Sequence, residues 1–406
     1  MKTLSTSLLA ITILCALSAC NTPDSAAPAD AGDSSLTPKS SPSPSPSPTP
    51  SSTRSSSPTP SPTPTSTPTS TPTSTQTPTP TQTPTPTTTS SPPTAGECST
   101  IGPITGLPYC AYAADSTWNQ ALPASPAIDA NSQAMLSNTF LNYKGRFYVN
   151  GPGGFPAYFT KSGDPTVKIN LTEPWGATNL QGASVPMPAN AVPAAPTDAH
   201  LTVLNSSTGD EYDYYEFPQN LAISSGMTIN VGYGNKVNYK TGSGWGGSTT
   251  AAGAALLAGL VTVDEFKSGT IHHALAVAPG CNNGAGKVYP ATAVAAWACP
   301  SAGGAGIPHG SRIWSDLTDA QVDALKMDVL STVLLKALHH YGGFVTDTNG
   351  WLAFDIRNLM DGIDTPQAQT WWNANGGNNP ALNSQPASFF TQHLHVLKVC
   401  VTQGTC

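Results

Sequence analysis

Charged side chains are scarce in this sequence. Asp, Glu, Lys and Arg make up 10% of the 406 residues, with 16 Lys and Arg against 23 Asp and Glu. Proteins that bind nucleic acid need clustered cations to neutralise phosphates. The composition therefore excludes nucleic acid as an expected partner and suits neutral or weakly polar ligands.

The sequence also lacks the common motifs of several enzyme classes. It has no glycine-rich phosphate loop, no Gly-x-Ser-x-Gly elbow and no His-Glu-x-x-His pair, which counts against nucleotide-binding proteins, esterases and zinc proteases. No Cys-x-x-Cys spacing indicates a zinc centre. We expect no cofactor and no metal, apart from a structural calcium ion for which "DGIDTP" (361–366) offers oxygens.

Aromatic residues are absent from positions 1–95, and from position 21 onward this stretch is nearly all Pro, Ser and Thr. Such a segment cannot bury a core, and its prolines favour extended geometry. We predict a disordered stalk over 20–95 that reaches about 3 Å per residue, on the order of 200 Å in all.

The N-terminal apolar run, Leu8 to Leu17, is too short for a permanent membrane span and follows one basic residue, Lys2. It has the form of a secretory signal. Its end, "LSAC", resembles the lipobox of bacterial lipoproteins. The resemblance implies a signal peptide over 1–19, a lipid on Cys20, and membrane attachment at the cell surface or outer membrane.

Six cysteines remain after Cys15 in the signal and Cys20. An even number in an exported protein predicts disulfides. They fall into three close pairs, and we predict the local bridges Cys98–Cys110, Cys281–Cys299 and Cys400–Cys406.

Residues 96–406 read as one β-rich domain, which we expect to be a monomer. Short runs of β-forming residues alternate with Gly, Pro, Asn and Ser, a pattern typical of a β-sandwich or jelly roll. "NSSTGD" is predicted to be the turn of a hairpin. One long amphipathic helix is predicted over 318–341, where Thr318 and Gln321 form a capping box, and a short one around "PQAQTWWN". The predicted strands include 145–149, 166–170, 200–204, 211–217, 227–231, "GTIHHALAVAP" and "HLHVLKVC".

The most acidic strand is "EYDYYEF", residues 211–217. Alternation puts Glu211 and Asp213 on one face, whereas Glu216 turns to the other unless a β-bulge intervenes. A retaining glycosidase needs two carboxyl groups about 5 Å apart. The pattern Glu-x-Asp-x-x-Glu resembles the signature of family-16 glycoside hydrolases. The resemblance implies a jelly roll and a retaining endo-hydrolase with Glu211 as nucleophile, Asp213 as assisting acid and Glu216 as acid/base.

Histidines offer a second set of candidates. In "TIHHALAV" strand alternation turns His272 and His273 to opposite faces, so they cannot share one metal, and His273 is either catalytic or a core residue. His393 and His395 are expected to share a face. Together with His200 and His309 they are expected either to cluster or to remain isolated residues with hydrogen-bond partners.

Two further functions stay open beside the hydrolase. A polysaccharide lyase needs a neutraliser and a base, for which Gln392, Arg146, His273 and Tyr212 or Tyr214 are candidates. A non-catalytic glycan-binding or envelope lipoprotein needs aromatic platforms and no converging acids. Trp245, in "GSGWGG", is predicted to be such a platform. Candidate substrate-binding residues are Trp245, His272, His200 and Tyr214.

Four stretches have a wider resemblance, to a widespread group of secreted bacterial proteins without an assigned activity. They are "GWGGSTTAAGAALLAGLVTVDEF", "GTIHHALAVA", "IPHGSRIW" and "ALHHYGGFVTDTNG". We therefore predict a surface-anchored protein that acts on extracellular polysaccharide, with hydrolysis ahead of lysis and simple binding.

Overall fold

The structure is a computed structural model. It describes residues 111–142, 147–149, 155–173, 175, 178–194, 198–247, 249–284, 286–295, 298–299, 306–348, 354–356, 358–359, 366–377 and 379–406. The predicted signal peptide, the stalk, Cys20, the Cys98–Cys110 bridge and most of the "DGIDTP" stretch lie outside the described residues. Within these ranges no helix is long and apolar enough to cross a membrane.

The predicted hairpin forms as expected. Strands β5 (Leu201–Asn205) and β6 (Asp210–Tyr215) pair antiparallel around the "NSSTGD" turn, with Leu201 opposite Tyr214. Gly209 closes the turn at φ +78°, a conformation that glycine adopts without strain. Periodicity and turn chemistry together therefore predicted this element correctly.

Two smaller sheets enclose one apolar core. The four-stranded sheet has the order β2-β5-β6-β8 and the three-stranded sheet the order β4-β3-β7. Tyr212 and Tyr214 point from β6 into the core between them, where they meet Ile169 and Val231. The pairs β2–β5 and β3–β7 are parallel. The further strands are β2 (Ala157–Phe159), β3 (Thr166–Leu171), β4 (Ser184–Pro186), β7 (Thr228–Val231) and β8 (Tyr233–Asn238).

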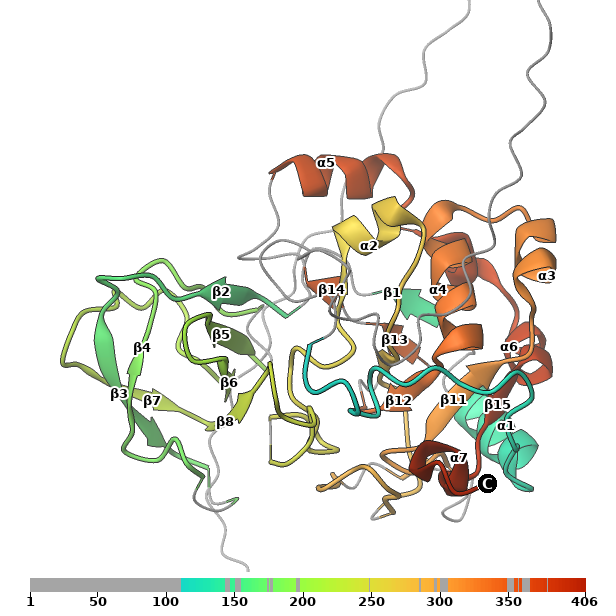
Figure 1. Cartoon of the computed structure of the whole chain (residues 1–406), viewed down its shortest axis with the longest axis horizontal. Coiled ribbons are helices and arrows are strands. Elements are labelled where there is room, and N and C mark those ends of the chain that lie inside the picture. Colours follow the sequence, from blue (N-terminus) through green and yellow to red (C-terminus); the bar gives the residue numbers. More distant parts are fainter. Residues whose placement is uncertain are drawn as a thin grey trace, which may run out of the picture. The chain divides into compact units, whose positions relative to one another are not determined.

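A six-stranded mixed sheet has the order β1-β13-β10-β12-β11-β15, and β9 and β14 form a short separate pair. Figure 1 shows the six-stranded sheet beside the helices, with the two smaller sheets on its other side. Its strands are β1 (Phe147–Val149), β10 (Leu275–Val277), β11 (Arg312–Ser315), β12 (Gly343–Val345), β13 (Phe354–Ile356) and β15 (Leu394–Val396); β9 is Val261–Thr262 and β14 Asn358–Leu359.

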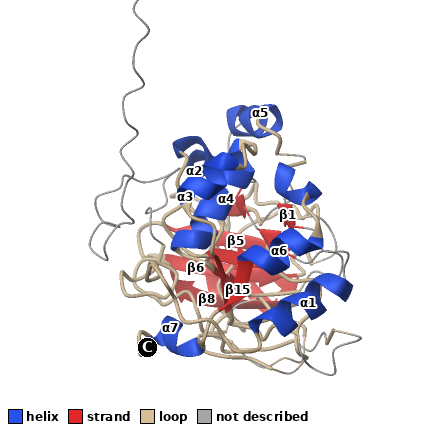
Figure 2. Cartoon of the chain, turned by 90° about the vertical axis from the view of Figure 1, so that its right-hand side faces the viewer, coloured by secondary structure: helices blue, strands red, loops and turns tan. Residues whose placement is uncertain are grey.

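Helices cover one face of this sheet. Leu275 and Val277 of β10 pack against Leu334 of α4, Phe140 of α1 and Phe390 of α6 in one core. Figure 2 shows α1, α4 and α6 in front of the strands. The helices are α1 (Ser132–Asn142), α2 (Val263–Ser268), α3 (Asp319–Ala324), α4 (Val329–His340), α5 (Pro366–Ala374), α6 (Ala387–His393) and α7 (Val399–Gln403).

The other face of the six-stranded sheet packs on the segment 244–260, which lies between it and the four-stranded sheet. Small residues of this segment meet Ala276 of β10 and Leu204 of β5 in a third core. At Gly259, which has φ +73°, an added Cβ would lie 2.4 Å from the backbone nitrogen of Ala276. Close approach of two backbones therefore explains the glycine here.

The prediction of a β-rich fold is confirmed, with mixed sheets, whereas the jelly roll stays a prediction. The prediction of one long helix over 318–341 is wrong, because the chain forms two helices, α3 and α4, in this region. Lys326 takes φ +51° between them, and the Asp328 carboxylate accepts a hydrogen bond from the Ser331 N–H at 2.9 Å. An N-cap of this kind starts a new helix. The disulfides Cys281–Cys299 and Cys400–Cys406 are confirmed.

The predicted capping box at Thr318 is present and gives a test of local stability. Gln321 Oε1 accepts from the Thr318 N–H at 2.9 Å, and Thr318 Oγ1 accepts from the Gln321 N–H at 3.4 Å. We expect Thr318→Ala to lower the free energy of unfolding by about 1 kcal/mol. Urea denaturation measures this. Thr318→Ser keeps the hydroxyl and serves as control, so equal losses in both variants would contradict the capping role.

Candidate functional site

Glu211 and Asp213 share a face of β6, as strand alternation predicts, but that face is covered. Glu211 accepts hydrogen bonds from the Tyr112 hydroxyl at 2.9 Å and the Leu257 N–H at 3.0 Å. Asp213 accepts from the Leu256 N–H at 2.9 Å and the Thr202 hydroxyl at 3.1 Å. The two carboxyl groups hold the segment 252–258 against the four-stranded sheet.

Burial controls the protonation of this pair. Glu211 is 0% and Asp213 1% exposed. Burial raises the pKa of Asp213 to about 7. Burial first, and then the neighbouring Asp213 carboxylate, raise the pKa of Glu211 well above its usual value. Buried, unpaired carboxylates are costly, so at least one of the two is protonated over much of the pH range.

Glu216 does not join them. The β6–β8 register runs without interruption from Asp210 to Tyr215, so there is no β-bulge. Glu216 follows the strand at φ +54° and is exposed. No sugar reaches the buried pair and Glu216 together. The hypothesis of one site built from Glu211, Asp213 and Glu216 is therefore corrected by the geometry.

His273 is a core residue rather than an accessible base. The strand begins only at Leu275, so the predicted alternation across His272 and His273 does not apply. His273 Nε2 lies 3.0 Å from a Glu265 carboxylate oxygen. Burial alone would lower the pKa of His273, but the Glu265 carboxylate and its hydrogen bond raise it above the usual value. Glu265 also closes the capping box of α2 through Thr262, so this ion pair anchors a helix start.

Two predicted sugar-binding aromatics lie in cores. Trp245 is 9% exposed because it stacks on Trp118, with ring centroids 5.1 Å apart, and donates to Thr117 Oγ1 at 3.1 Å. The prediction of an exposed platform at Trp245 is wrong. Tyr214 is fully buried between the two smaller sheets. The glycines around Trp245 suggested that its side chain is exposed to solvent. Sequence alone does not reveal which residues pack on the Trp245 ring.

The other predicted histidines are spread over several places. His393 and His395 both contact the Asp316 carboxylate, at 3.0 and 3.1 Å. His309 lies against Asn282, and His272 is half-buried near Tyr341. In the part of the chain that the structure describes, no group of three or more His, Cys, Asp or Glu residues is placed to hold a metal ion.

The candidate lyase set is not brought together either. His273 is paired with Glu265, and Tyr212 and Tyr214 face the core between the two smaller sheets. Gln392 lies on α6, among the helices that cover the six-stranded sheet. Arg146 lies outside the described residues. His273, Tyr212 and Tyr214 are buried, whereas Gln392 is exposed on a different element, so these four residues do not converge on one uronate.

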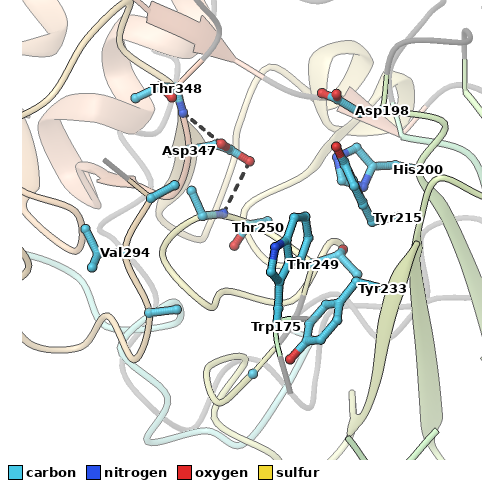
Figure 3. Close-up of a pocket in the computed structure, with 14 residues that line it drawn as sticks. Trp175, Asp198, His200, Tyr215, Tyr233, Thr249, Thr250, Val294, Asp347 and Thr348 are labelled. Atoms are coloured by element: carbon cyan, nitrogen blue, oxygen red, sulfur yellow. Dashed lines mark hydrogen bonds between the residues drawn. The ribbon is translucent and has the colours of Figure 1, made fainter. Parts of the chain in front are cut away.

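A cavity of about 660 Å³ lies where the four-stranded sheet meets the loops beside β12 (Figure 3). His200, one of the predicted substrate-binding residues, lines it just before β5. The lining residues are Trp175, Asp198, His200, Tyr215, Tyr233, Gly247, Thr249, Thr250, Ala251, Ala293, Val294, Ala295, Asp347 and Thr348.

Aromatic rings form one wall of this cavity. Trp175 is 57% exposed. Its ring centroid lies 5.4 Å from that of Tyr215 and 5.5 Å from that of Tyr233, with tilted planes. Indole and phenol rings in this arrangement present apolar faces and polar edges together. A large exposed Trp in contact with two tyrosines offers a surface on which a flat, partly apolar ligand can stack.

Two carboxylates lie on opposite sides of the cavity in Figure 3. Asp198 precedes β5 and is exposed. Asp347 follows β12 and accepts a hydrogen bond from the Thr348 N–H at 2.8 Å, with the Ala251 N–H at 3.5 Å. Burial first, and then the Glu216 and Asp198 carboxylates, raise the pKa of Tyr215 to about 12, so this phenol keeps its proton and can donate.

The segment 249–253 connects the walls of the cavity. The Ala252 N–H donates to Thr346 O at 2.8 Å, and Ala252 O accepts from the Thr292 and Ala293 N–H groups at 3.0 and 3.1 Å. The buried Cys281–Cys299 disulfide closes the loop that carries 293–295. The cavity therefore has a covalently braced wall.

Sequence reasoning missed Trp175, Tyr215, Tyr233, Asp198 and Asp347. The useful signal was position in the chain, because Trp175 and Asp347 lie in the loops that follow β3 and β12, and loops at strand ends carry many binding residues. No protein-family model matches this chain, and neither a curated protein nor a solved structure is similar enough to match.

Proposed function

We propose that this protein is an exported, lipid-anchored glycoside hydrolase that cleaves extracellular polysaccharide in the cavity beside Trp175. The Pro/Ser/Thr-rich stalk over 20–95 would hold the domain away from the membrane to which Cys20 is attached. Asp198 and Asp347, which line the cavity, would carry the reaction in place of the buried Glu211 and Asp213.

One observation carries the proposal: the cavity combines an exposed aromatic platform with carboxylates on two sides. Sugar rings stack on indole faces, and Trp175 is 57% exposed. Glycoside hydrolysis uses one carboxyl group to protonate the leaving oxygen and a second to act on the anomeric centre or on water. Asp198 and Asp347 are the residues of the cavity that offer this pair.

A lyase is the second candidate, and the cavity disfavours it. Lyases act on uronates, whose carboxylate must be neutralised before a proton is removed. Among the described residues that line the cavity there is no Lys or Arg. Non-catalytic glycan binding, in contrast, would use the same aromatic wall.

We also propose that the two smaller sheets correspond to the expected jelly-roll sandwich. The parallel pairs β2–β5 and β3–β7 depart from the antiparallel pairing of a regular jelly roll.

Incubation of the purified protein with a panel of polysaccharides tests the reaction type. Reducing ends and the absorbance of unsaturated uronates are read together. We expect new reducing ends without unsaturated products, which indicates hydrolysis. Both signals together would replace the hydrolase by a lyase, and silence across the panel with measurable binding would replace it by a binding protein.

We expect Trp175→Ala to weaken glycan binding by about 5-fold to 150-fold, because the loss of one stacking ring costs roughly 1–3 kcal/mol. Isothermal titration calorimetry with the glycan identified by the panel measures this. Tyr289→Ala is the matched control, because Tyr289 is also exposed, at 49%, and does not line the cavity. Equal affinities of Trp175→Ala and the parent protein would remove the platform from the proposal.

A further inference from the structure

Apart from the titratable His200, the charged side chains that line the cavity of the proposed function are carboxylates. Its two ionisable acids are Asp198 and Asp347, and no lining residue among those described is a Lys or Arg. Two more acids lie at the Trp175 end, since the carboxylates of Glu216 and Glu173 both act on the Tyr215 hydroxyl. The aromatic wall is therefore bordered by carboxylates.

Backbone contacts hold these acids together. The Glu216 N–H donates to Asp198 O at 2.8 Å, and the Glu173 N–H donates to Gly232 O at 2.9 Å. A Cβ at Gly232 would lie 2.5 Å from a Glu216 carboxylate oxygen, so the Glu216 side chain lies directly on the backbone beside Tyr233. Gly232 is thus the position that admits a carboxylate next to the ring platform.

This charge is spread rather than focused. No three of the described acids or histidines are placed to hold a metal ion, and Asp198 and Glu216 are exposed. Spread negative charge beside an exposed indole suits an extended cationic ligand. Ammonium groups are attracted both to carboxylates and to the face of Trp. An anionic ligand would meet carboxylates on both sides of the cavity.

We infer that the cavity selects glycans that carry free amino groups, such as 2-amino-2-deoxy sugars, over neutral glycans and most strongly over uronates. This inference rests on the proposed function and names its substrate class. Asp198, Glu173 and Glu216 are the specificity-determining residues at the Trp175 end. Neutral sugars still stack on Trp175, so the charge changes the preference rather than the platform.

Three hexamers with the same β-1,4-linked backbone test the inference: glucose, N-acetylglucosamine and glucosamine. At about pH 6 amines and carboxylates both carry charge. We expect the glucosamine hexamer to bind about 10-fold more tightly than the other two in titration calorimetry, and an oligogalacturonate least tightly. The advantage should shrink as salt rises, because salt screens exposed charges.

The double variant Glu173→Gln/Glu216→Gln, which keeps Asp198 and Asp347, should lose most of this preference while its affinity for the glucose hexamer stays within twofold. Asp323→Asn, an exposed acid on α3, is the matched control and should keep the preference. If the glucose and glucosamine hexamers bind equally well to the parent protein, the inference is wrong and the proposed function stands. If neither these hexamers nor any glycan of the wider panel binds, both are wrong.

Discussion

Asp347→Asn should lower the rate of glycan cleavage by about 10³-fold and leave glycan affinity within about twofold. A carboxyl group that transfers a proton in the transition state contributes roughly 10²-fold to 10⁴-fold to a rate, and an amide cannot replace it. Asn keeps an oxygen that accepts from the Thr348 N–H, as Asp347 does at 2.8 Å. The wall of the cavity should therefore keep its shape.

Asp198→Asn should have a similar effect on rate, because hydrolysis needs both carboxyl groups. Initial rates of reducing-end formation and calorimetric affinities, measured on the same preparations, separate catalysis from binding. The acid Asp323 on α3 is again the control, and Asp323→Asn should leave the rate unchanged. A variant at Asp347 that cleaves at the parent rate would show that the acids of the cavity bind and do not react.

The acidic strand shows how far sequence reasoning reaches. Alternation correctly put Glu211 and Asp213 on one face, because strand geometry is local. It could not show what covers that face. The covering groups are the N–H groups of Leu256 and Leu257, more than 40 residues away, and the Tyr112 hydroxyl, 99 residues away. Contacts of that range have no local signature.

The small-residue segment 249–259 shows the same limit of local sequence patterns. Its alanines and leucines are typical of a helix, yet the described residues form turns, with Gly253 and Gly259 at positive φ. Two sheets approach this segment from both sides, and that tertiary fit overrides helix propensity. The prediction of one long helix is wrong for a local reason. Lys326 has a positive φ and Asp328 is the N-cap of α4, so the helix ends and a new one begins although the apolar residues continue at helical spacing. A single Asp inside an apolar repeat was the signal that could have revealed the break.

The second large effect that we expect is a loss of stability as pH rises from about 4 to 7, caused by Glu211 and Asp213. Asp213 has a folded-state pKa of about 7 because of burial, against about 4 in an unfolded chain. A raised carboxyl pKa means that the folded state keeps a proton which the unfolded state releases. The stability is therefore fully present below about pH 4 and is lost as pH rises through the folded pKa.

Because burial raises the pKa of both Glu211 and Asp213, the free energy of unfolding should fall across this range by an amount on the order of a few kcal/mol. Asp213→Asn should remove most of this slope and make the protein more stable than the parent above about pH 7, because the neutral amide still accepts from the Leu256 N–H. Asp213→Ala, which leaves Leu256 and Thr202 without their partner, should be less stable at every pH. Urea denaturation at a series of pH values measures all three proteins.

Subtracting the pH profile of stability of Asp213→Asn from that of the parent isolates the contribution of Glu211 and Asp213. The contributions of His273 and His309 cancel, because both histidines titrate in both proteins. Tyr112 and Tyr239, which also face Glu211, keep their protons in this range because burial raises their pKa values. Asp323→Asn changes an exposed carboxyl and should run parallel to the parent. Parallel profiles for Asp213→Asn would show that the buried pair does not control stability.

Deprotonation of the Glu211 and Asp213 pair should also change the glycan affinity of the cavity. Glu211 and Asp213 hold Leu256 and Leu257, and the chain runs from there through Ala252, which is bonded to both cavity walls, to Thr249 and Thr250 in the lining. We expect a second negative charge in the buried pair to loosen this segment. We therefore expect glycan affinity to fall over the pH range in which stability falls, and Asp213→Asn to keep its affinity there. Calorimetry across that range decides this, because a residue that only supports the fold would leave affinity unchanged while the protein stays folded.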